Sequence, residues 1–217
     1  MTDAKPFDTL DDLDVGGRRV LVRIDLNVPI DDVGEIADDT RIQHLTPTLT
    51  ELAERGARVV LMSHLGRPKG RRDDDLSLGF LAMPLSQALG GADVAMISDC
   101  IGAGVEKAVE ALRPGQFALL ENLRFHPGEE KNDPAFADKL ARLGDLYVND
   151  AFSVSHRAHA SLVGVAERLP HAAGRLMQAE LEALEKALGN PARPVMAIIG
   201  GAKVSTKLEL LANLIDK

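Results

Sequence analysis

Aromatic residues and cysteines are scarce in this sequence. Its 217 residues include no tryptophan, one tyrosine, six phenylalanines and a single cysteine, Cys100. So few aromatic rings argue against a base-stacking platform and against an aromatic cage for a cationic ligand. A lone cysteine excludes an intrachain disulfide and any cysteine-built zinc site, and we expect no metal site elsewhere in the chain.

The sequence also lacks long hydrophobic runs and an excess of basic residues. Its longest continuous apolar runs, such as residues 59–62 and 195–199, are far shorter than the roughly 20 residues that cross a bilayer. The acidic N-terminus shows no basic region followed by an apolar one, so we expect no secretory signal and a cytoplasmic protein. A formal net charge of −8 argues against nucleic acid and anionic membranes as partners.

What the sequence does contain is a regular alternation of short apolar runs and helical patterns. The runs are apolar almost throughout, as in strands that are buried on both faces of a sheet. The helical stretches mostly end on glycine just before the next run, which is typical of repeated strand–helix units. This pattern predicts an α/β fold with a doubly wound, mostly parallel sheet in a Rossmann-like three-layer arrangement. The predicted strands span residues 19–24, 57–62, 92–97, 117–120, 145–148 and 195–199.

The predicted domain organisation follows from a change of pattern near residue 170. Residues 1–170 hold five of the predicted strands and are expected to form one domain. Residues 171–190 are expected to connect two domains, because apolar side chains recur at helical spacing over 174–188. Residues 191–217 carry one predicted strand and one helix, which are too few for a core. We therefore expect them to open a second, truncated α/β domain.

Polar and charged side chains follow four of the predicted strands. Ligands of open parallel sheets bind at the carboxyl ends of the strands, so these side chains are candidates for a site. Three of the four post-strand segments carry arginine and two carry histidine, and a further arginine opens the first crossover helix. The candidates are Asp25, Asn27, Arg41, His64, Arg67, Arg124 and Arg157.

The arginines are informative as a group. Each one alone is what a solvated surface displays. Several at one edge of a sheet repel one another unless an anion lies among them, even in a protein that is acidic overall. The planar guanidinium fork matches the oxygens of phosphate and carboxylate groups two at a time. We therefore predict a multiply charged anionic ligand, such as a phosphorylated carboxylic acid.

Other polar residues have two readings at this stage. Asp25 either forms a salt bridge with a neighbouring arginine or accepts a hydrogen bond from a ligand hydroxyl, with Asn27 adding a second contact. The segment 200–207 either holds phosphate through its backbone amides and lysines or is a tight turn with surface lysines. Three histidines are either satisfied in the core or interact with phosphate: His64, His156 and His159.

Six motifs, in this order along the chain, together closely resemble phosphoglycerate kinase. The match runs from end to end, although members of the family are about twice as long. By this resemblance, residues 1–170 are the N-terminal domain that binds 3-phosphoglycerate, and 191–217 begin the nucleotide-binding C-terminal domain. The missing half would carry most of the contacts to the nucleotide and to magnesium. The motifs are RIDLNVP, DDTRI, SHLGRP, ENLRF, NDAFSVSHRAHAS and IIGGAKVSTK.

The resemblance implies a role for each matching residue. Asp25 and Asn27 would contact the hydroxyl and carboxylate part of 3-phosphoglycerate. Arg41 and Lys203 would be the catalytic residues, directed at the transferred group from the two domains, and Lys207 would contact nucleotide phosphate. The phosphate of 3-phosphoglycerate and its neighbouring oxygens would be held by His64, Arg67, Arg124 and Arg157.

The implied activity is reversible phosphoryl transfer between ATP and the carboxylate of 3-phosphoglycerate, through 1,3-bisphosphoglycerate, in glycolysis and gluconeogenesis. Mg-ATP or Mg-ADP would be a co-substrate, with no tightly bound cofactor, and we expect a monomer. The alternative is a binding module that captures 3-phosphoglycerate without turnover. The length of the chain favours this alternative for the 217 residues on their own, which we expect to be inactive.

Overall fold

The computed structural model describes residues 6–31, 33–189, 191–194, 196 and 198. It divides into two compact units, residues 1–177 and 178–217, and each is described by itself. The first unit contains the sheet and the helices around it. In the second, the described part is dominated by the continuation of α6 (Arg175–Leu188) from Gln178 onward. Among the described residues, no helix combines the length and hydrophobicity that crossing a membrane requires.

The first unit is built around a six-stranded sheet in which every neighbouring pair of strands is parallel. The strand order is β3-β4-β2-β1-β5-β6. Since parallel neighbours cannot be joined by tight hairpins, the chain must return across a face of the sheet after each strand. The predicted doubly wound parallel sheet is thus confirmed. The strands are β1 (Arg19–Arg23), β2 (Arg58–Met62), β3 (Val94–Met96), β4 (Phe117–Leu119), β5 (Leu146–Asn149) and β6 (His171–Ala173).

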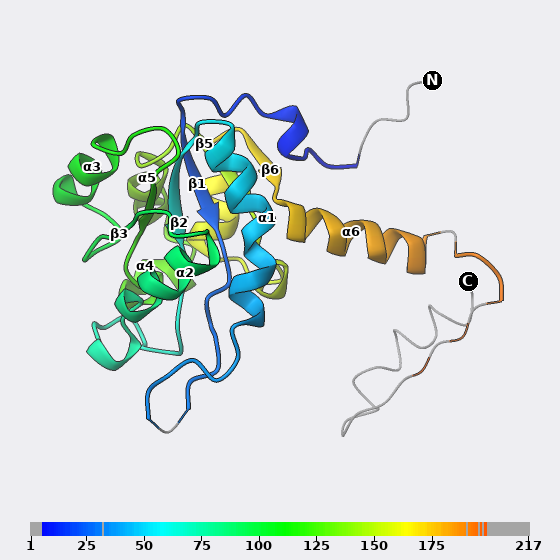
Figure 1. Cartoon of the computed structure of the whole chain (residues 1–217), viewed down its shortest axis with the longest axis horizontal. Helices are drawn as coiled ribbons and strands as arrows, with labels where there is room; N and C mark the ends of the chain where they lie inside the picture. Colours follow the sequence, from blue (N-terminus) through cyan, green and yellow to red (C-terminus); the bar gives the residue numbers. More distant parts are fainter. Residues whose placement is uncertain (1–5, 32, 190, 195, 197, 199–217) are drawn as a thin grey trace. The chain divides into compact units, whose positions relative to one another are not determined.

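Helices cover both faces of the sheet and make the structure three-layered (Figure 1). On one face α1 (Thr40–Glu54) and α2 (Ala82–Ala88) pack over side chains such as Val22 and Leu61. On the other face α3 (Ala103–Glu110) and α5 (Pro134–Ala141) pack over the alternate positions of the same strands. Period-two alternation in a strand sends successive side chains to opposite faces, so near-continuous apolar runs supply both cores.

Short helical segments complete the connections. The helix α5 begins at Pro134 for two local reasons. Asp133 accepts a hydrogen bond from the backbone N–H of Phe136 (2.8 Å), and Pro134 occupies the first helical turn. The remaining segments are single turns of helix: η1 (Leu10–Asp12), η2 (Asp74–Leu76), η3 (Gly79–Leu81), η4 (Leu123–Phe125), α4 (Pro127–Glu130), η5 (Phe152–Val154) and η6 (Ala160–Gly164), the last of π type.

The sixth strand of the sheet differs from the one that the sequence predicts. Five predicted strands form within two residues of their expected ends, but the predicted strand at 195–199 lies largely outside the described residues. The sixth observed strand, β6, falls in a stretch that we predicted as part of the connector. Its three residues include no β-branched side chain. Among the described residues, it pairs only with β5 and, through Ala173, with Thr9. So short a run at a sheet edge has no recognisable periodicity.

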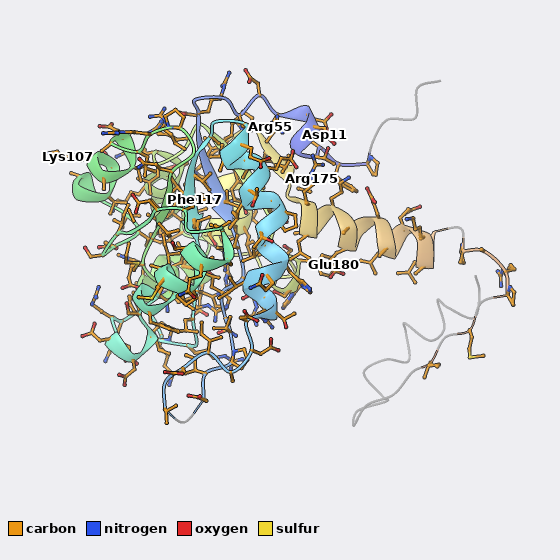
Figure 2. The ribbon with its side chains drawn as sticks, in the orientation of Figure 1. Asp11, Arg55, Lys107, Phe117, Arg175 and Glu180 are labelled. Carbon is orange, nitrogen blue, oxygen red and sulfur yellow. The ribbon has the colours of Figure 1, made fainter. Side chains whose placement is uncertain are left out.

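The start of α6 is held by Arg175. Its guanidinium group donates to Asp11 (2.7 Å) and to both carboxylate oxygens of Glu51 (2.7 and 2.8 Å), while its backbone N–H donates to Thr48 Oγ1 (2.8 Å). Figure 2 shows Arg175 beside Asp11, with Arg55 near them. Hydrogen bonds to these two carboxylates raise the pKa of Arg175. The helix predicted over 174–188 therefore begins at Arg175, which α1 and η1 fix in place.

Gly174 is required by its close approach to Asp150. A Cβ at this position would lie 2.3 Å from Asp150 Oδ1, which accepts the backbone N–H of Met177 (3.0 Å). Gly174→Ala should therefore lower the free energy of unfolding by about 1–3 kcal/mol, because Asp150 is fully buried and must move. Gly104→Ala in α3 is the matched control: its new Cβ meets nothing within 4 Å, and alanine should stabilise the helix by up to ~1 kcal/mol. Urea unfolding measures both, and equal midpoints would contradict this account.

Candidate functional site

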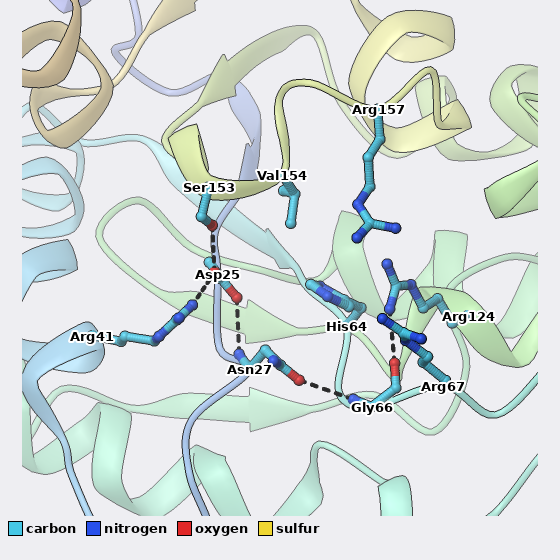
Figure 3. Close-up of a pocket in the computed structure, with 10 residues that line it drawn as sticks. All are labelled: Asp25, Asn27, Arg41, His64, Gly66, Arg67, Arg124, Ser153, Val154 and Arg157. Atoms are coloured by element: carbon cyan, nitrogen blue, oxygen red, sulfur yellow. Dashed lines mark hydrogen bonds and ion pairs between the residues drawn. The ribbon is translucent and has the colours of Figure 1, made fainter. Parts of the chain in front are cut away.

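A polar pocket lies at the carboxyl ends of the four central strands. Segments that follow β1, β2, β4 and β5 supply its walls, together with the first turn of α1 (Figure 3). This is the edge at which open parallel sheets bind ligands. All seven residues predicted for the substrate site in the first domain line this pocket. The full lining consists of Asp25, Asn27, Arg41, His64, Gly66, Arg67, Arg124, Ser153, Val154 and Arg157.

Asp25 is the single carboxylate of the pocket lining. It is paired with Arg41, it accepts a hydrogen bond from Ser153 Oγ (2.5 Å), and it accepts the backbone N–H of Asn27 (3.0 Å). Burial by itself opposes ionisation of Asp25, but these hydrogen bonds and the charge of Arg41 outweigh it and lower its pKa. Asp25 is therefore an anion that orients Arg41 at the entrance of the pocket, so the salt-bridge reading of the sequence holds in this structure.

Gly66 joins two walls of the pocket through its backbone. Its N–H donates to Asn27 Oδ1 (3.0 Å) and its carbonyl accepts from Arg124 Nη1 (2.7 Å). The residue adopts a positive φ of 59°, and a Cβ there would lie 2.8 Å from Leu76. Only glycine fits this turn without strain, because left-handed backbone and the close side chain both penalise a Cβ. One backbone unit thus sets the position of the amide after β1 and the guanidinium after β4.

His64 is buried in the floor of the pocket as a neutral ring. Its Nδ1 lies 3.1 Å from Nη2 of Arg23, which is fully buried beneath it. Arginine can only donate, so Nδ1 must be the acceptor and Nε2 must carry the ring proton. Burial, followed by the charges of Arg23 and Arg124, lowers the pKa of His64 to about 3. The imidazole is therefore a hydrogen-bond donor without a charge at neutral pH.

Arg124 and Arg157 reach into the pocket from opposite walls and point toward one another (Figure 3). The Nε atoms of both are buried and hydrogen-bond to none of the described residues. Glu130 approaches Arg124 Nε only to 3.4 Å, as an ion pair without a hydrogen bond. Burial and the nearby Arg157 and Arg23 lower the pKa of Arg124, against the opposing charge of Glu130. Buried donors that lack acceptors are costly, so the pocket is suited to an anion.

A second layer of buried polar groups lies below the pocket, and no pattern in the sequence predicts it. Arg23 Nε donates to Ser161 Oγ (3.0 Å), and Ser161 Oγ donates in turn to Glu129 Oε1 (2.6 Å). Glu129 also accepts the backbone N–H of Ser161 (2.9 Å) and lies 3.7 Å from His159 Nδ1. Burial would raise the pKa of Glu129, but His159, Arg23 and Ser161 together lower it. Glu129 thus compensates the buried charge of Arg23.

Several predicted residues have other places in the structure. His159 is buried beside Glu129, and His156 is exposed; neither lines the pocket. Lys203 and Lys207 lie outside the described residues. Gly66, Ser153 and Val154 line the pocket without having been singled out. Ser153 was the easiest to find, because it lies in the segment after β5 that also carries Arg157.

The neutral form of His64 has a consequence for stability below neutral pH. Since the pKa falls from 6.5 in the unfolded chain to about 3 in the folded one, the unfolded chain binds more protons between these values. Stability is therefore lost as the pH falls through that window. Between pH 7 and 5, the free energy of unfolding of the wild type should fall by about 2 kcal/mol more than that of His64→Gln, at about 1.4 kcal/mol per pH unit.

Urea unfolding at pH 7 and at pH 5 tests this prediction, and the exposed His156→Gln should behave as the wild type. Identical losses in wild type and His64→Gln would show that His64 titrates normally.

Comparison with known proteins places this pocket in context. The family model described as phosphoglycerate kinase matches residues 10–217. A phosphoglycerate kinase of Brucella suis is 61% identical over 211 residues, which cover 97% of this chain and 53% of the relative. That of Rhodospirillum centenum is 60% identical with the same coverage.

Solved structures of phosphoglycerate kinases share the fold of this chain. The structure of phosphoglycerate kinase from Coxiella burnetii matches with a TM-score of 0.87 and 42% identity, over 98% of this chain and 53% of that one. The enzyme from Pyrococcus horikoshii matches with a TM-score of 0.85 and 35% identity. The chain thus spans about half the length of the relatives it matches. Over that span, its sequence and its fold show that it belongs to the phosphoglycerate kinase family.

Proposed function

We propose that the pocket binds 3-phosphoglycerate and that the protein containing this sequence is a phosphoglycerate kinase. The observation that carries the binding proposal is the pair of buried guanidinium Nε groups, in Arg124 and Arg157, that make no hydrogen bond to any of the described residues. A phosphate group supplies several acceptor oxygens and the compensating negative charge. Membership in the family supports the identity of the acid.

The arrangement of the pocket suggests how the acid would lie. Its phosphate would contact Arg124, Arg157 and Arg67, with His64 Nε2–H as a neutral donor. Its hydroxyl and carboxylate would lie toward Asp25 and Asn27. Asp25 is already held by Arg41 and Ser153, so it is positioned to accept a hydrogen bond from the hydroxyl without being displaced. A carboxylate ligand next to Asp25 is tolerable because Arg41 lies beside both.

The proposed reaction is reversible phosphoryl transfer between ATP and the carboxylate of 3-phosphoglycerate, with 1,3-bisphosphoglycerate as the acyl phosphate. A carboxylate with a pKa near ~4 is ionised at neutral pH, so the attacking oxygen needs no general base. Catalysis is then a matter of alignment and of neutralising charge on the transferred group. Arg41 would supply that charge from the first domain. Lys203 would supply it from the second, and Lys207 would contact the phosphates of Mg-ATP or Mg-ADP.

The organisation of the molecule is proposed on the same basis. Residues 1–170 would be the 3-phosphoglycerate-binding domain, 171–190 the connecting segment and 191–217 the beginning of the nucleotide-binding domain. Substrates carried by different domains must be brought together, and closure would exclude water from the reaction. We propose a cytoplasmic monomer that binds neither nucleic acid nor membrane.

The binding proposal is tested by calorimetric titration with 3-phosphoglycerate. Arg124→Ala should weaken binding roughly 10- to 100-fold, because a charge-assisted hydrogen bond to a buried phosphate is lost. Arg58→Ala is the matched control: it removes a guanidinium group at the opposite, amino end of β2, where Arg58 donates to Gly17 O. The control should bind like the wild type. Equal weakening in both variants would mean that only the overall charge attracts the acid, and no binding by the wild type would refute the proposal.

The transfer proposal is tested by a coupled assay of turnover in the protein extended to the full length of its relatives. Arg41→Ala should lower kcat at least tenfold with a smaller effect on binding of 3-phosphoglycerate, because Arg41 acts on the charge of the transferred group. Arg58→Ala should leave kcat unchanged. If Arg41→Ala turns over normally, Arg41 has no part in transfer; if the extended wild type does not turn over, the pocket is a binding module.

A further inference from the structure

Three side chains that favour metal ions gather away from the substrate pocket. Asp99, Cys100 and His126 each place one potential ligand atom within 4.8 Å of the other two. Among the described residues, no other group of three potential metal ligands lies this close together. None of the three lines the pocket described above. They combine a carboxylate, a thiol and an imidazole, which are three ligand types of zinc in proteins.

The fold brings these residues together from two separate connections. Asp99 and Cys100 follow the edge strand β3, and His126 follows η4, after β4. Because β3 and β4 are parallel neighbours, the segments after them leave the sheet at the same edge. The backbone N–H of Glu121 donates to Asp99 O (3.4 Å) and ties the two connections together. The cluster therefore belongs to the packed part of the first unit.

Each of the three side chains is held in place. His126 Nε2 lies 2.7 Å from Asp99 Oδ1, and the ring stacks on Phe136 with 5.3 Å between centroids. Asp99 Oδ1 also accepts the backbone N–H of Cys100 (2.6 Å). Cys100 is fully buried, whereas the side chains of His126 and Asp99 are 28% and 50% exposed. Asp99 and His126 therefore form the exposed side of the cluster, and the thiol of Cys100 is its buried member.

We propose that Asp99, Cys100 and His126 bind a thiophilic divalent cation of the zinc type. Three protein ligands leave the fourth position of a tetrahedral site to water, on the side where Asp99 and His126 are exposed. The thiol favours zinc over magnesium and calcium, which prefer oxygen ligands. On binding, the thiol proton of Cys100 and any proton shared by Asp99 and His126 leave to solvent, and the three ligands supply lone pairs to the cation.

The three ligand atoms already lie within 4.8 Å of one another, which is close to the spacing that a bound zinc ion requires. Zinc bonds of about 2.0–2.3 Å place ligand atoms roughly 3–4 Å apart. The distance between Asp99 Oδ1 and His126 Nε2, now 2.7 Å, must therefore increase slightly. Any ligand atoms that lie farther apart than this spacing must move closer together. Asp99 is half exposed and follows the end of β3, so its carboxylate has room to turn. His126 directly precedes α4, and Glu130 of α4 forms an ion pair with Arg124. A bound cation would therefore hold the start of α4 in place beside Arg124.

This proposal departs from the expectation, drawn from the sequence, that the chain has no metal site. That expectation rested in part on the single cysteine, which cannot build a zinc site by itself. Here one cysteine joins a neighbouring aspartate and a histidine 26 positions away. The competing interpretation is an Asp99–His126 ion pair that happens to lie beside a packed cysteine. The two differ in whether sulfur can take part in binding.

Titration of the purified chain with Co²⁺ distinguishes the metal site from the simple ion pair. A thiolate bound to Co²⁺ gives a charge-transfer absorption that carboxylate and imidazole ligands do not give. The wild type should develop this absorption and saturate at one equivalent. Cys100→Ser should abolish it. His126→Gln keeps the cysteine and should weaken Co²⁺ binding at least tenfold. His171→Gln, which removes an exposed imidazole on β6, is the matched control and should leave binding unchanged.

A thermal measurement supplies a second readout. Saturating Zn²⁺ should raise the Tm of the wild type by about 5 °C and that of His126→Gln by much less, because binding to the folded state alone stabilises it. The Tm without metal shows whether each variant folds. The proposal is overturned if the folded wild type gives no thiolate absorption, or if His126→Gln and Asp99→Asn bind Co²⁺ as tightly as the wild type.

Discussion

Four guanidinium groups share one small pocket with a single carboxylate, and the surrounding structure is arranged around this concentration of like charge. Arg41 is paired with Asp25, and Arg124 is fixed by the carbonyl of Gly66 and approached by Glu130. Arg157 and Arg124 nevertheless retain buried Nε groups with no acceptor among the described residues. An overall charge of −8 does not remove this local repulsion, because short-range interactions in a partly buried site are poorly screened.

A buried layer of charged and polar side chains supports the pocket from beneath. Arg23 holds Nδ1 of His64, and Glu129 neutralises Arg23 through Ser161. Breaking a buried charge network of this kind by removing one member typically costs about 3–5 kcal/mol, because the remaining charge is left unpaired. The network thus fixes the tautomer of His64 before any ligand arrives. A donor that is already oriented loses little conformational freedom on binding.

Much of this arrangement could be predicted from the sequence because parallel sheets obey a simple rule. Residues that follow the strands of such a sheet meet at one edge, so locating β1, β2, β4 and β5 was enough to bring Asp25, His64, Arg124 and Arg157 together. The near-continuous apolar runs located those strands. The role of each residue in binding stays a prediction that the titrations above test.

Other features depend on tertiary contacts that leave no local pattern. The strand β6 is three residues long at a sheet edge, and it is defined by its pairing with β5 and a single bridge to Thr9. Glu129 lies in a single helical turn that reads as an exposed, acidic segment, yet it is fully buried because Ser161 and Arg23 lie against it. Asp99, Cys100 and His126 become neighbours only when β3 and β4 pair. In each case the partner is far away along the chain.

The central claim is that one phosphate binds between Arg124 and Arg157, whose buried Nε–H groups make no hydrogen bond to the described residues. It is tested most directly by following the Nε–H resonances of the arginines by NMR while 3-phosphoglycerate is added. The account predicts that the resonances of Arg124 and Arg157 shift together and saturate at one equivalent, while those of Arg19 and Arg168, which are paired with Asp145 and Asp138, stay where they are. Shifts spread over all arginines, or none at Arg124 and Arg157, would contradict it.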